Sequence, residues 1–354
     1  MNSELRQDLV SGDWIVMAPG RGKKPDEFTP KPQKRIRAPI QGCPFEDPQK
    51  SGNEAPLLVY PHTKRTHTSF SAKGASVRSG VGVYPHRRSW KLQIIQNKYP
   101  ALSHYDGCAR LFKRGPYSLM DGRGYHNIVI TRDHNKNFSH LSSADALSLF
   151  MAFQQRYRSS LKDPCLAYIL IFHNWGPKAG ASVYHPHYQM IGIPVIPPDV
   201  GHSLDGSAAY FKKNKKCVHC AMIEWEKKNK RRIIFENKNA IAFAPFVSRE
   251  PFEVRIFPKN HSSYFENASV RDLQSVVSLL QKSLLAMEKR LGDPDYNFFI
   301  HTAPLRNKKR YHHYHWHIEI LPKILISAGF ELGTGIEITV VDPDEAARIL
   351  RNTK

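Results

Sequence analysis

The sequence predicts an α+β fold composed of two similar halves. In each half, strand-like stretches come before one long amphipathic helix, and further strands follow it. Each half also has a histidine just before the helix and a His-x-His sequence on a late strand. The two motifs lie 51 residues apart from His134 to His185 and 54 residues apart from His261 to His315. Motifs that recur in the same order at nearly the same spacing indicate an internal duplication.

The first half is expected to begin with an irregular region and to contain one long helix. Residues 19–58 are rich in proline, glycine and lysine, which favours loop structure. Ser142 or Ser143 can cap a helix that runs to about Leu161, because apolar residues follow at helical spacing. The prolines and glycines of 194–206 are typical of a linker. The expected strands are 91–96, 125–132, 167–174 and 185–193.

The second half is expected to repeat this order. A helix begins near Ser269, where Asp272 forms a near capping box, and runs to about Arg290. The expected strands are 232–237, 240–245, 251–258, 296–302 and 313–321. With the boundary at the linker, residues 1–200 form an N-terminal half and residues 201–354 form a C-terminal half.

The composition is that of a globular protein with a strongly basic charge. Among 354 residues, 41% are hydrophobic, and the formal net charge is +21. Such a charge attracts anions, including nucleotides and sugar phosphates. No basic helix with interleaved aromatics stands out, so nucleic acid is not expected as the primary ligand. No apolar run reaches the roughly 18–20 residues of a membrane span. Because the N-terminus also lacks the features of a secretion signal, we expect a cytoplasmic protein.

The five cysteines argue against a disulfide framework, because their number is odd and no secretion signal precedes them. Cys108 and Cys165 resemble ordinary small apolar residues. Cys217 and Cys220 differ, since a Cys-x-x-Cys sequence presents two thiolates to one metal ion.

Each half offers four side chains that suit a tetrahedral zinc site. The candidate ligands are Cys43, Glu46, His134 and His185 in the first half and Cys217, Cys220, His261 and His315 in the second. A carboxylate can bind zinc, but Glu46 could equally be a solvated loop residue, which would leave a weak site or none. The alternative in the second half is a pair of surface thiols with two incidental histidines. We expect one to two zinc ions per chain, with the second-half site the firmer of the two.

The strongest catalytic signal is the sequence HPHYQ that begins at His185. Side chains at i and i+2 of a strand share a face, so His185, His187 and Gln189 are expected to point the same way. The preceding loop, 174–182, contains glycines that let backbone N–H groups approach a phosphate. A lone histidine on such a strand is usually just a hydrogen-bonded residue. Together with these neighbours, however, His187 is predicted to be a nucleophile.

These motifs resemble those of the galactose-1-phosphate uridylyltransferases and their nucleotide-sugar phosphorylase relatives, the transferase branch of the histidine-triad superfamily. The resemblance covers nearly the whole chain in order, and its most specific part is NWGPKAGASVYHPHYQ at 174–189. The other matching segments are 12–25, 43–46, 97–102, 133–134, 217–220, 298–304, 315–322 and 329–347. The family's fold is two histidine-triad-like halves that form a pseudo-dimer around one extended antiparallel sheet with flanking helices.

The resemblance assigns roles to individual residues. By position, His187 is the nucleophile that attacks the α-phosphorus of UDP-glucose, and Gln189 holds the phosphoryl oxygens. His185 and His134 are zinc ligands. The residues matched to the substrate site are Arg21, Asn97, Asn174, Gly180, Ser182 and, for the hexose hydroxyls, Glu331.

The resemblance implies a nucleotidyltransferase of galactose metabolism, UDP-glucose–hexose-1-phosphate uridylyltransferase, with a uridylyl-His187 intermediate. The expected partners are a UDP-sugar and a sugar 1-phosphate, and a homodimer is compatible with this function. An alternative stays open, because the family's first Cys-x-x-Cys reads CPFE at 43–46. In addition, CVHC at 217–220 is closer to the branch with two zinc sites, which includes ADP-glucose phosphorylase. Such a phosphorylase transfers the nucleotidyl group to inorganic phosphate.

Overall fold

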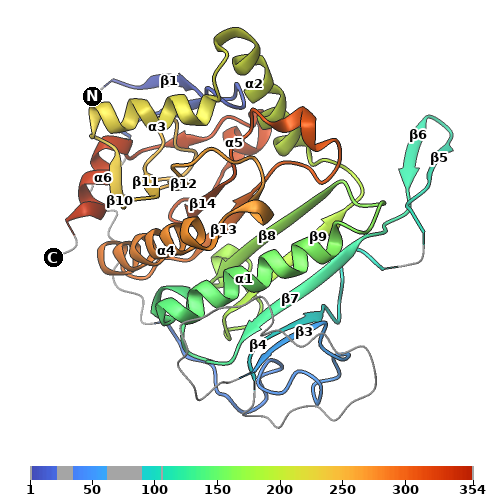
Figure 1. The fold of residues 1–354 in the computed structure, drawn as a ribbon. Coiled ribbons are helices and arrows are strands. Elements are labelled where there is room, and N and C mark those ends of the chain that lie inside the picture. Colours follow the sequence, from blue (N-terminus) through green and yellow to red (C-terminus); the bar gives the residue numbers. More distant parts are fainter. Residues whose placement is uncertain (1, 22–34, 62–89, 105–106, 353–354) are drawn as a thin grey trace.

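A computed structural model describes residues 2–21, 35–61, 90–104 and 107–352 (Figure 1). Its centre is one ten-stranded sheet with the strand order β10-β11-β12-β14-β13-β8-β9-β7-β4-β3. Every neighbouring pair in this sheet is antiparallel. The predicted fold class, an extended antiparallel sheet with flanking helices, is therefore confirmed.

All of the predicted strands and both of the predicted helices are present, with ends that differ by at most four residues. The strands of the large sheet are β3 (Leu58–Pro61), β4 (Trp90–Gln96), β7 (Tyr125–Thr131), β8 (Tyr168–Trp175), β9 (His187–Ile193), β10 (Ile233–Glu236), β11 (Ala240–Phe243), β12 (Val254–Pro258), β13 (Tyr296–His301) and β14 (His317–Pro322). The helices are α1 (Ser143–Ser160), α2 (Pro198–Asn214), α3 (Val218–Asn229), α4 (Val270–Leu291), α5 (Gly329–Thr334) and α6 (Pro343–Arg351). Among the described residues, no helix has the length and apolar character needed to cross a membrane.

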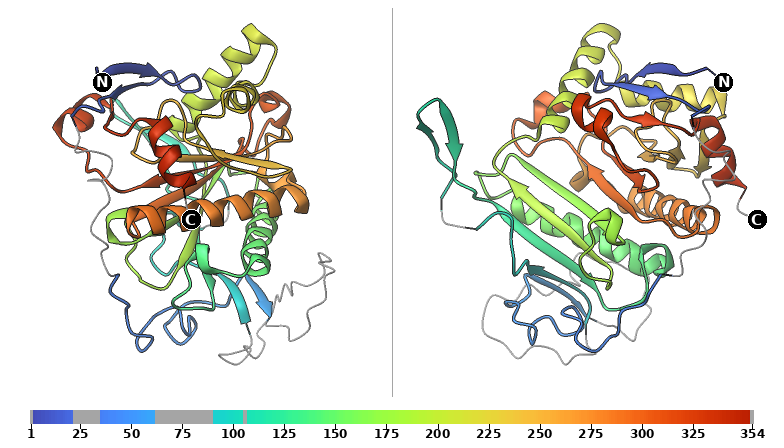
Figure 2. Two further views of the ribbon diagram at one scale, coloured as in Figure 1. Left: turned by 90° about the vertical axis from the view of Figure 1, so that its left-hand side faces the viewer. Right: turned by 180° about the vertical axis from the view of Figure 1, so that it is seen from behind.

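Two smaller units accompany the large sheet. A three-stranded sheet consists of β1 (Glu4–Gln7), β2 (Trp14–Met17) and β15 (Ile338–Thr339), and a separate hairpin consists of β5 (Leu111–Arg114) and β6 (Tyr117–Met120). Figures 1 and 2 show the three-stranded sheet and α2 at the end of the molecule away from β3 and β4.

The internal duplication is visible as two five-stranded halves of the large sheet. The halves meet where β8 pairs antiparallel with β13, with Phe172 opposite Phe299. Outward from this seam, the first half runs β8-β9-β7-β4-β3 and the second half runs β13-β14-β12-β11-β10. The boundary proposed between residues 200 and 201 falls within α2, which precedes the strands of the second half.

The two long helices cover one face of the sheet. Ser142 caps α1 and Ser269 caps α4, each by accepting a hydrogen bond from a backbone N–H three residues later at 3.1 Å. Their apolar side chains join one core with alternate residues of β9 and β14, such as Tyr188 and Ile318. Because side chains of a strand alternate between faces, the residues beside them, His187 and His317 among others, point to the face opposite the helices.

The prediction of a linker over 194–206 was wrong. The structure forms α2 from Pro198 to Asn214, with Pro197 at the N-cap position. Proline is tolerated in the first turn of a helix, because the N–H group that it lacks would have no intrahelical partner there. Val200 and Leu204 then pack against Tyr168 on the face of the sheet opposite α1 and α4.

The prediction for Cys108 and Cys165 was also wrong, because these two residues form a disulfide. The bond joins the segment before the β5–β6 hairpin to the loop between α1 and β8. An odd number of cysteines excludes complete pairing but does not exclude one bond, and the sequence offered no sign that these loops meet. The remaining cysteines, Cys43, Cys217 and Cys220, are free thiols.

Candidate functional site

His187 is held in one orientation at the first position of β9. Its side chain is 5% exposed, and its Nδ1 lies 3.0 Å from the backbone carbonyl oxygen of His185. A carbonyl oxygen can only accept, so Nδ1 carries the proton and Nε2 keeps its lone pair. Burial lowers the pKa of His187 below its ordinary value, which favours the neutral ring. The arrangement supplies a neutral imidazole whose Nε2 lone pair can act as a nucleophile.

The end of β8 and the loop that follows it bring the predicted phosphate-site residues close to one another. Asn174 and Ser182 both line a cavity of about 560 Å³, which His187 does not line. Gly180 has a φ of +84°, and a Cβ added there would come within 3.6 Å of Asn174 Nδ2. Asn297 of β13, a residue that sequence reasoning missed, donates from Nδ2 to Asn174 Oδ1 and to Ala179 O at 2.8 Å each. The second half of the sheet therefore orients the Asn174 amide and anchors the loop.

Gln189 belongs to a chain of hydrogen bonds whose polarity is fixed at one end. The Tyr99 N–H donates to Asn97 Oδ1 at 3.0 Å, so the Asn97 amide nitrogen faces the His126 ring, 3.3 Å from Nδ1 and 3.2 Å from Nε2. The Ala101 N–H donates to His126 Nδ1 at 3.2 Å, which fixes Nδ1 as the acceptor. Since Nδ1 accepts, Nε2 of His126 carries the ring proton. Nε2 lies 2.7 Å from Gln189 Oε1 and therefore donates to it.

The consequence is a defined orientation for the Gln189 amide. With Oε1 occupied by His126, the NH₂ group of Gln189 is the part left to donate to a substrate. Burial lowers the pKa of His126, which agrees with the neutral tautomer that this chain of bonds requires. Asn97, a predicted substrate residue, contacts His126. His126 carried no signal in the sequence, because its link to Gln189 depends on the pairing of β7 with β9.

The first metal group consists of Cys43, His134 and His185, whose ligand atoms all lie within 4.8 Å of one another. Glu46 is not part of that mutually close set, but its Oε1 lies 3.4 Å from His134 Nδ1 and 3.5 Å from His185 Nδ1. Its other oxygen, Oε2, accepts from Arg132 at 2.8 Å. Glu46 therefore points into the group and is 5% exposed, so it is not a solvated loop residue.

The geometry of this group fits a tetrahedral zinc ion. Ordinary zinc–ligand lengths place a bound sulfur about 3.6 Å from a bound nitrogen, and a bound carboxylate oxygen about 3.4 Å from a bound nitrogen. The distance from Cys43 Sγ to His185 Nδ1 is 3.6 Å. His134 Nδ1 is buried without a hydrogen bond among the described residues. The Nε2 atoms of His134 and His185 donate to Ala38 O and Thr131 O, which leaves both Nδ1 atoms available to a metal.

The second metal group contains all four predicted ligands, Cys217, Cys220, His261 and His315, within 4.8 Å of one another. Cys220 Sγ lies 3.4 Å from His261 Nδ1 and 3.6 Å from His315 Nδ1. His261 Nε2 donates to the backbone carbonyl of His312 at 2.7 Å, which again directs Nδ1 to the group. Two thiolates and two imidazoles at these distances form a set typical of structural zinc.

Two predicted substrate residues, Arg21 and Glu331, lie in a part of the fold away from His187. Arg21 is exposed just after β2, and Glu331 lies in α5, where its Oε2 accepts from Ala328 N at 3.0 Å. Figures 1 and 2 show β2 and α5 in the part of the molecule that contains the second half. The described residues thus bring His187, Gln189, Asn174, Gly180 and Ser182 to one region but leave Arg21 and Glu331 outside it.

Comparison with known proteins agrees with this architecture. Residues 115–353 match the family described as a domain of unknown function, DUF4921. The chain is 32% identical to an ADP-glucose phosphorylase of Arabidopsis thaliana, over 98% of this chain and 92% of that protein. It is 29% identical to a galactose-1-phosphate uridylyltransferase of Thermotoga maritima, over 77% and 88% of the two chains.

Solved structures give the same result. The crystal structure of an ADP-glucose phosphorylase from Arabidopsis thaliana with bound ADP-glucose has a TM-score of 0.77 and 30% identity, with both chains fully covered. A uridylyltransferase structure has a TM-score of 0.70 and 27% identity, over 99% and 98% of the two chains. The chain therefore belongs to the family of galactose-1-phosphate uridylyltransferases and ADP-glucose phosphorylases, and to the DUF4921 family.

Proposed function

We propose that the protein is a nucleotide-sugar phosphorylase that acts on ADP-glucose through a covalent nucleotidyl-His187 intermediate. The observation that carries the proposal is the geometry of His187, a buried neutral imidazole whose Nδ1 donates to the His185 carbonyl. The choice of phosphorylase rests on the similarity to the Arabidopsis ADP-glucose phosphorylase over nearly the whole chain. The uridylyltransferase function expected from the sequence has less support, since the uridylyltransferase relatives named above are 29% and 27% identical.

In the first half-reaction, Nε2 of His187 attacks the α-phosphorus of ADP-glucose. A bond forms between Nε2 and that phosphorus, and the bond from the phosphorus to the bridging oxygen breaks. Glucose 1-phosphate leaves and AMP remains on the histidine. Imidazole suits this step, because its neutral form is a nucleophile near pH 7.

In the second half-reaction, inorganic phosphate takes the place of glucose 1-phosphate. A phosphate oxygen attacks the same phosphorus, the bond to Nε2 breaks, and ADP leaves. The net reaction converts ADP-glucose and phosphate into ADP and glucose 1-phosphate, and His187 returns to its initial state. Both steps take place at the same phosphorus atom. The sugar phosphate leaves it in the first step and the imidazole of His187 leaves it in the second, so one histidine serves both.

Gln189 is proposed to stabilise negative charge on the phosphoryl oxygens. Its NH₂ group is fixed toward the substrate by the bond from His126 to Oε1. A donor that is oriented before the reaction loses no free energy to reorientation during it. His126 thus acts as a positioning residue for Gln189, and Asn174 and Ser182 are proposed to bind phosphate oxygens. Arg21 and Glu331 remain proposed substrate residues, but they would have to reach the site from a second copy of the chain.

Zinc is the proposed metal of both groups. Bound by Cys43, Glu46, His134 and His185, it would hold the segment before His187 in place. The donor sets and the buried, unbonded Nδ1 of His134 fit this ion. The chemical step itself is assigned to His187 and Gln189.

The test is the mass of the intact protein after incubation with a nucleotide sugar and no acceptor. ADP-glucose is expected to add one AMP unit to the wild-type chain, and UDP-glucose is expected to add much less of a UMP unit. Phosphate should then remove the adduct and release ADP. An equal or larger adduct from UDP-glucose, discharged by galactose 1-phosphate but not by phosphate, would instead support the uridylyltransferase function.

A further inference from the structure

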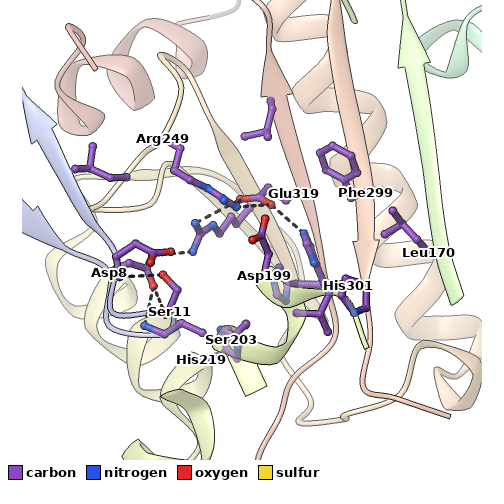
Figure 3. Close-up of a pocket in the computed structure, with 18 of the residues that line it drawn as sticks. Asp8, Ser11, Leu170, Asp199, Ser203, His219, Arg249, Phe299, His301 and Glu319 are labelled. Atoms are coloured by element: carbon purple, nitrogen blue, oxygen red, sulfur yellow. Dashed lines mark hydrogen bonds and ion pairs between the residues drawn. The ribbon is translucent and has the colours of Figure 1, made fainter. Parts of the chain in front are cut away.

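A cavity of about 300 Å³ lies on the second half of the sheet (Figure 3). Residues of the β1–β2 turn, β8, β13, β14 and α2 line it, and it is separate from the cavity beside Asn174 and Ser182. Its size is near the lower limit for small-molecule sites. The described residues around it repeat the geometry of the His187 site with different chemistry.

The strand register identifies the equivalent positions. Phe172 of β8 lies opposite Gln189 of β9, and Phe299 of β13 lies opposite Glu319 of β14. Glu319 is therefore the counterpart of Gln189. Two residues earlier on its strand, His317 is the counterpart of His187.

His317 has the same local geometry as the proposed nucleophile. Its Nδ1 lies 3.0 Å from the carbonyl oxygen of His315, the first histidine of its own His-x-His sequence. The ring is 5% exposed and stacks between Phe257 and His301, with ring centroids 4.7 and 4.8 Å away. Its Nε2 makes no hydrogen bond to the described residues, so this nitrogen can accept one from a ligand.

The difference lies at Glu319, where a carboxylate replaces the amide of Gln189. His301 Nε2 donates to Glu319 at 2.9 Å, and Arg249 and Arg255 each approach it to 3.4 Å. Burial raises the pKa of Glu319, but these two guanidinium groups hold it well below its ordinary value. The ionised carboxylate has no N–H group, so it cannot donate to phosphoryl oxygens as the Gln189 amide is proposed to do. The second site is therefore unsuited to nucleotidyl transfer.

The charges inside the cavity balance one another. The carboxylates of Glu319 and Asp8 pair with the guanidinium groups of Arg255 and Arg249. Asp13 and Asp199, both exposed, add two further carboxylates at the rim. No group of three metal-ligating side chains occurs here among the described residues. Neither an anion nor a metal ion is favoured in such a space, which leaves an uncharged ligand.

The hydrogen-bonding groups of the cavity suit hydroxyls. His219, 1% exposed, lines the cavity, and neither of its ring nitrogens has a partner among the described residues. Leaving a buried polar group without a partner costs about 1–3 kcal/mol. Ser203 and Arg249 add donors, and Glu319 adds acceptor lone pairs (Figure 3). Hydroxyl groups both donate and accept, so neighbouring hydroxyls can satisfy such a mixed set.

We propose that this cavity is a second binding site, and that it takes an uncharged, hydroxyl-rich ligand about the size of one sugar ring. Phe299 and Leu170 offer an apolar surface for the C–H face of such a ring, opposite the polar groups near Asp8 (Figure 3). A free hexose and the ribose of an unphosphorylated nucleoside share this chemistry.

The experiment uses the full chain loaded with zinc and measures binding of D-glucose, adenosine and inorganic phosphate by NMR, with ¹⁵N-labelled histidine rings. The variants are Leu170→Trp, which fills the cavity, and Arg249→Gln, which removes a partly exposed cation from it. Arg271→Gln on the exposed surface of α4 is the matched control. All three are expected to keep wild-type nucleotidyl transfer, which verifies folding.

Glucose or adenosine is expected to shift the ring signals of His301 and His317 in the wild type and in His187→Gly. Both cavity variants should bind that probe at least about tenfold more weakly, a change of roughly 1.4 kcal/mol, and the control should bind it normally. Comparison of D-glucose with adenosine decides whether the cavity takes a free hexose or the ribose of a nucleoside. The proposal is overturned if phosphate alone shifts these signals, if neither uncharged probe does, or if both cavity variants bind like the wild type.

Discussion

At the scale of single residues, the proposed chemistry depends on one proton position. The carbonyl of His185 holds the proton of His187 on Nδ1, so Nε2 is free to attack phosphorus. Pro186 between the two histidines restricts the backbone that sets this distance. His317 makes the same contact with the carbonyl of His315, but the residue two positions later is Glu319 instead of a glutamine. The same backbone geometry is therefore present without the amide that the proposed reaction uses. The identity of that neighbouring side chain, more than the histidine itself, separates the two halves.

Replacing the nucleophile tests the covalent route. His187→Gly is expected to abolish the AMP adduct and to lower the rate of phosphorolysis by a factor of about 10⁴–10⁶, as removal of a nucleophile does in other enzymes. Adenosine 5′-phosphorimidazolide should restore release of ADP in the presence of phosphate, because it supplies the missing imidazole already bonded to the phosphorus. His104→Gly, at an exposed loop histidine, is the control. Normal turnover by His187→Gly would exclude the adduct mechanism.

A double-mutant cycle tests whether His126 acts through Gln189. Gln189→Ala should lower the rate of adduct formation about 10²–10³-fold, the effect of losing one preorganised donor, with little change in the affinity for ADP-glucose. His126→Leu should lower it at least about tenfold, and His126→Gln, which keeps a donor near the same place, should recover part of the rate. The double variant should be no slower than Gln189→Ala alone. Effects that multiply would show that His126 contributes independently of Gln189.

The sequence indicates the proposed reactive residue and the candidate metal ligands more readily than the contacts that support them. His187 and the two metal groups were predicted from short motifs that recur in both halves, which a single sequence displays directly. His126 and Asn297 act across strand pairs, from β7 to β9 and from β13 to the loop after β8. Such contacts become visible only when register is known, because no local pattern marks them.

At the scale of elements, two predictions failed. One concerned cysteines in loops that meet only in the folded chain, and the other concerned a helix that begins with proline. Helices α1 and α4 were predicted from serine caps and apolar spacing, both of which are local signals. Helix α2 was missed because Pro197 and Pro198 indicate a break when read alone, although they suit the start of a helix. The β5–β6 hairpin, which includes exposed Leu111 and Tyr117, was also not predicted.

The disulfide beside this hairpin gives a testable element-scale prediction. Under oxidising conditions the Cys108–Cys165 bond closes a loop with a sequence separation of 57 residues. The chain-entropy model gives such a bond about 4 kcal/mol of stabilisation. Cys165→Ser should therefore unfold at lower denaturant concentration than the wild type in oxidising buffer, and the difference should vanish in reducing buffer. The wild type, denatured without reductant and with a chelator, should titrate as Cys43, Cys217 and Cys220 only. Five reactive thiols would exclude the bond.

At the scale of the whole molecule, one continuous sheet carries two metal groups and two histidine sites with different chemistry. The first half keeps an amide beside its histidine, and the second half keeps a carboxylate held by two arginines. Because β8 and β13 join the halves directly, Asn297 of the second half orients Asn174 of the first. The second half therefore supports the proposed His187 site structurally, although a carboxylate takes the place of the amide in its own histidine site.

The two metal groups should differ in affinity, and this difference concerns the stability of the whole chain. The second group has two thiolates and two imidazoles, so it is expected to bind zinc tightly and to stabilise the fold. In the first group, Glu46 also accepts a hydrogen bond from Arg132 at 2.8 Å, which competes for its negative charge. Elemental analysis should therefore give between one and two zinc ions per chain. Cys217→Ser should lower the melting temperature more than Cys43→Ser does.

Glu46 decides whether the first group is a four-ligand zinc site. Its Oε1 lies 3.4 and 3.5 Å from the two histidine Nδ1 atoms, close to the separation of about 3.4 Å expected for ligands of one tetrahedral zinc. Glu46→Cys should raise the zinc content toward two per chain, because a thiolate binds zinc well and makes no ion pair with Arg132. Glu46→Gln should lower it toward one, and Asp47→Asn next to it is the matched control. Unchanged zinc content in both Glu46 variants would show that Glu46 serves only as a partner of Arg132. The segment before His187 would then be held by the three ligands Cys43, His134 and His185.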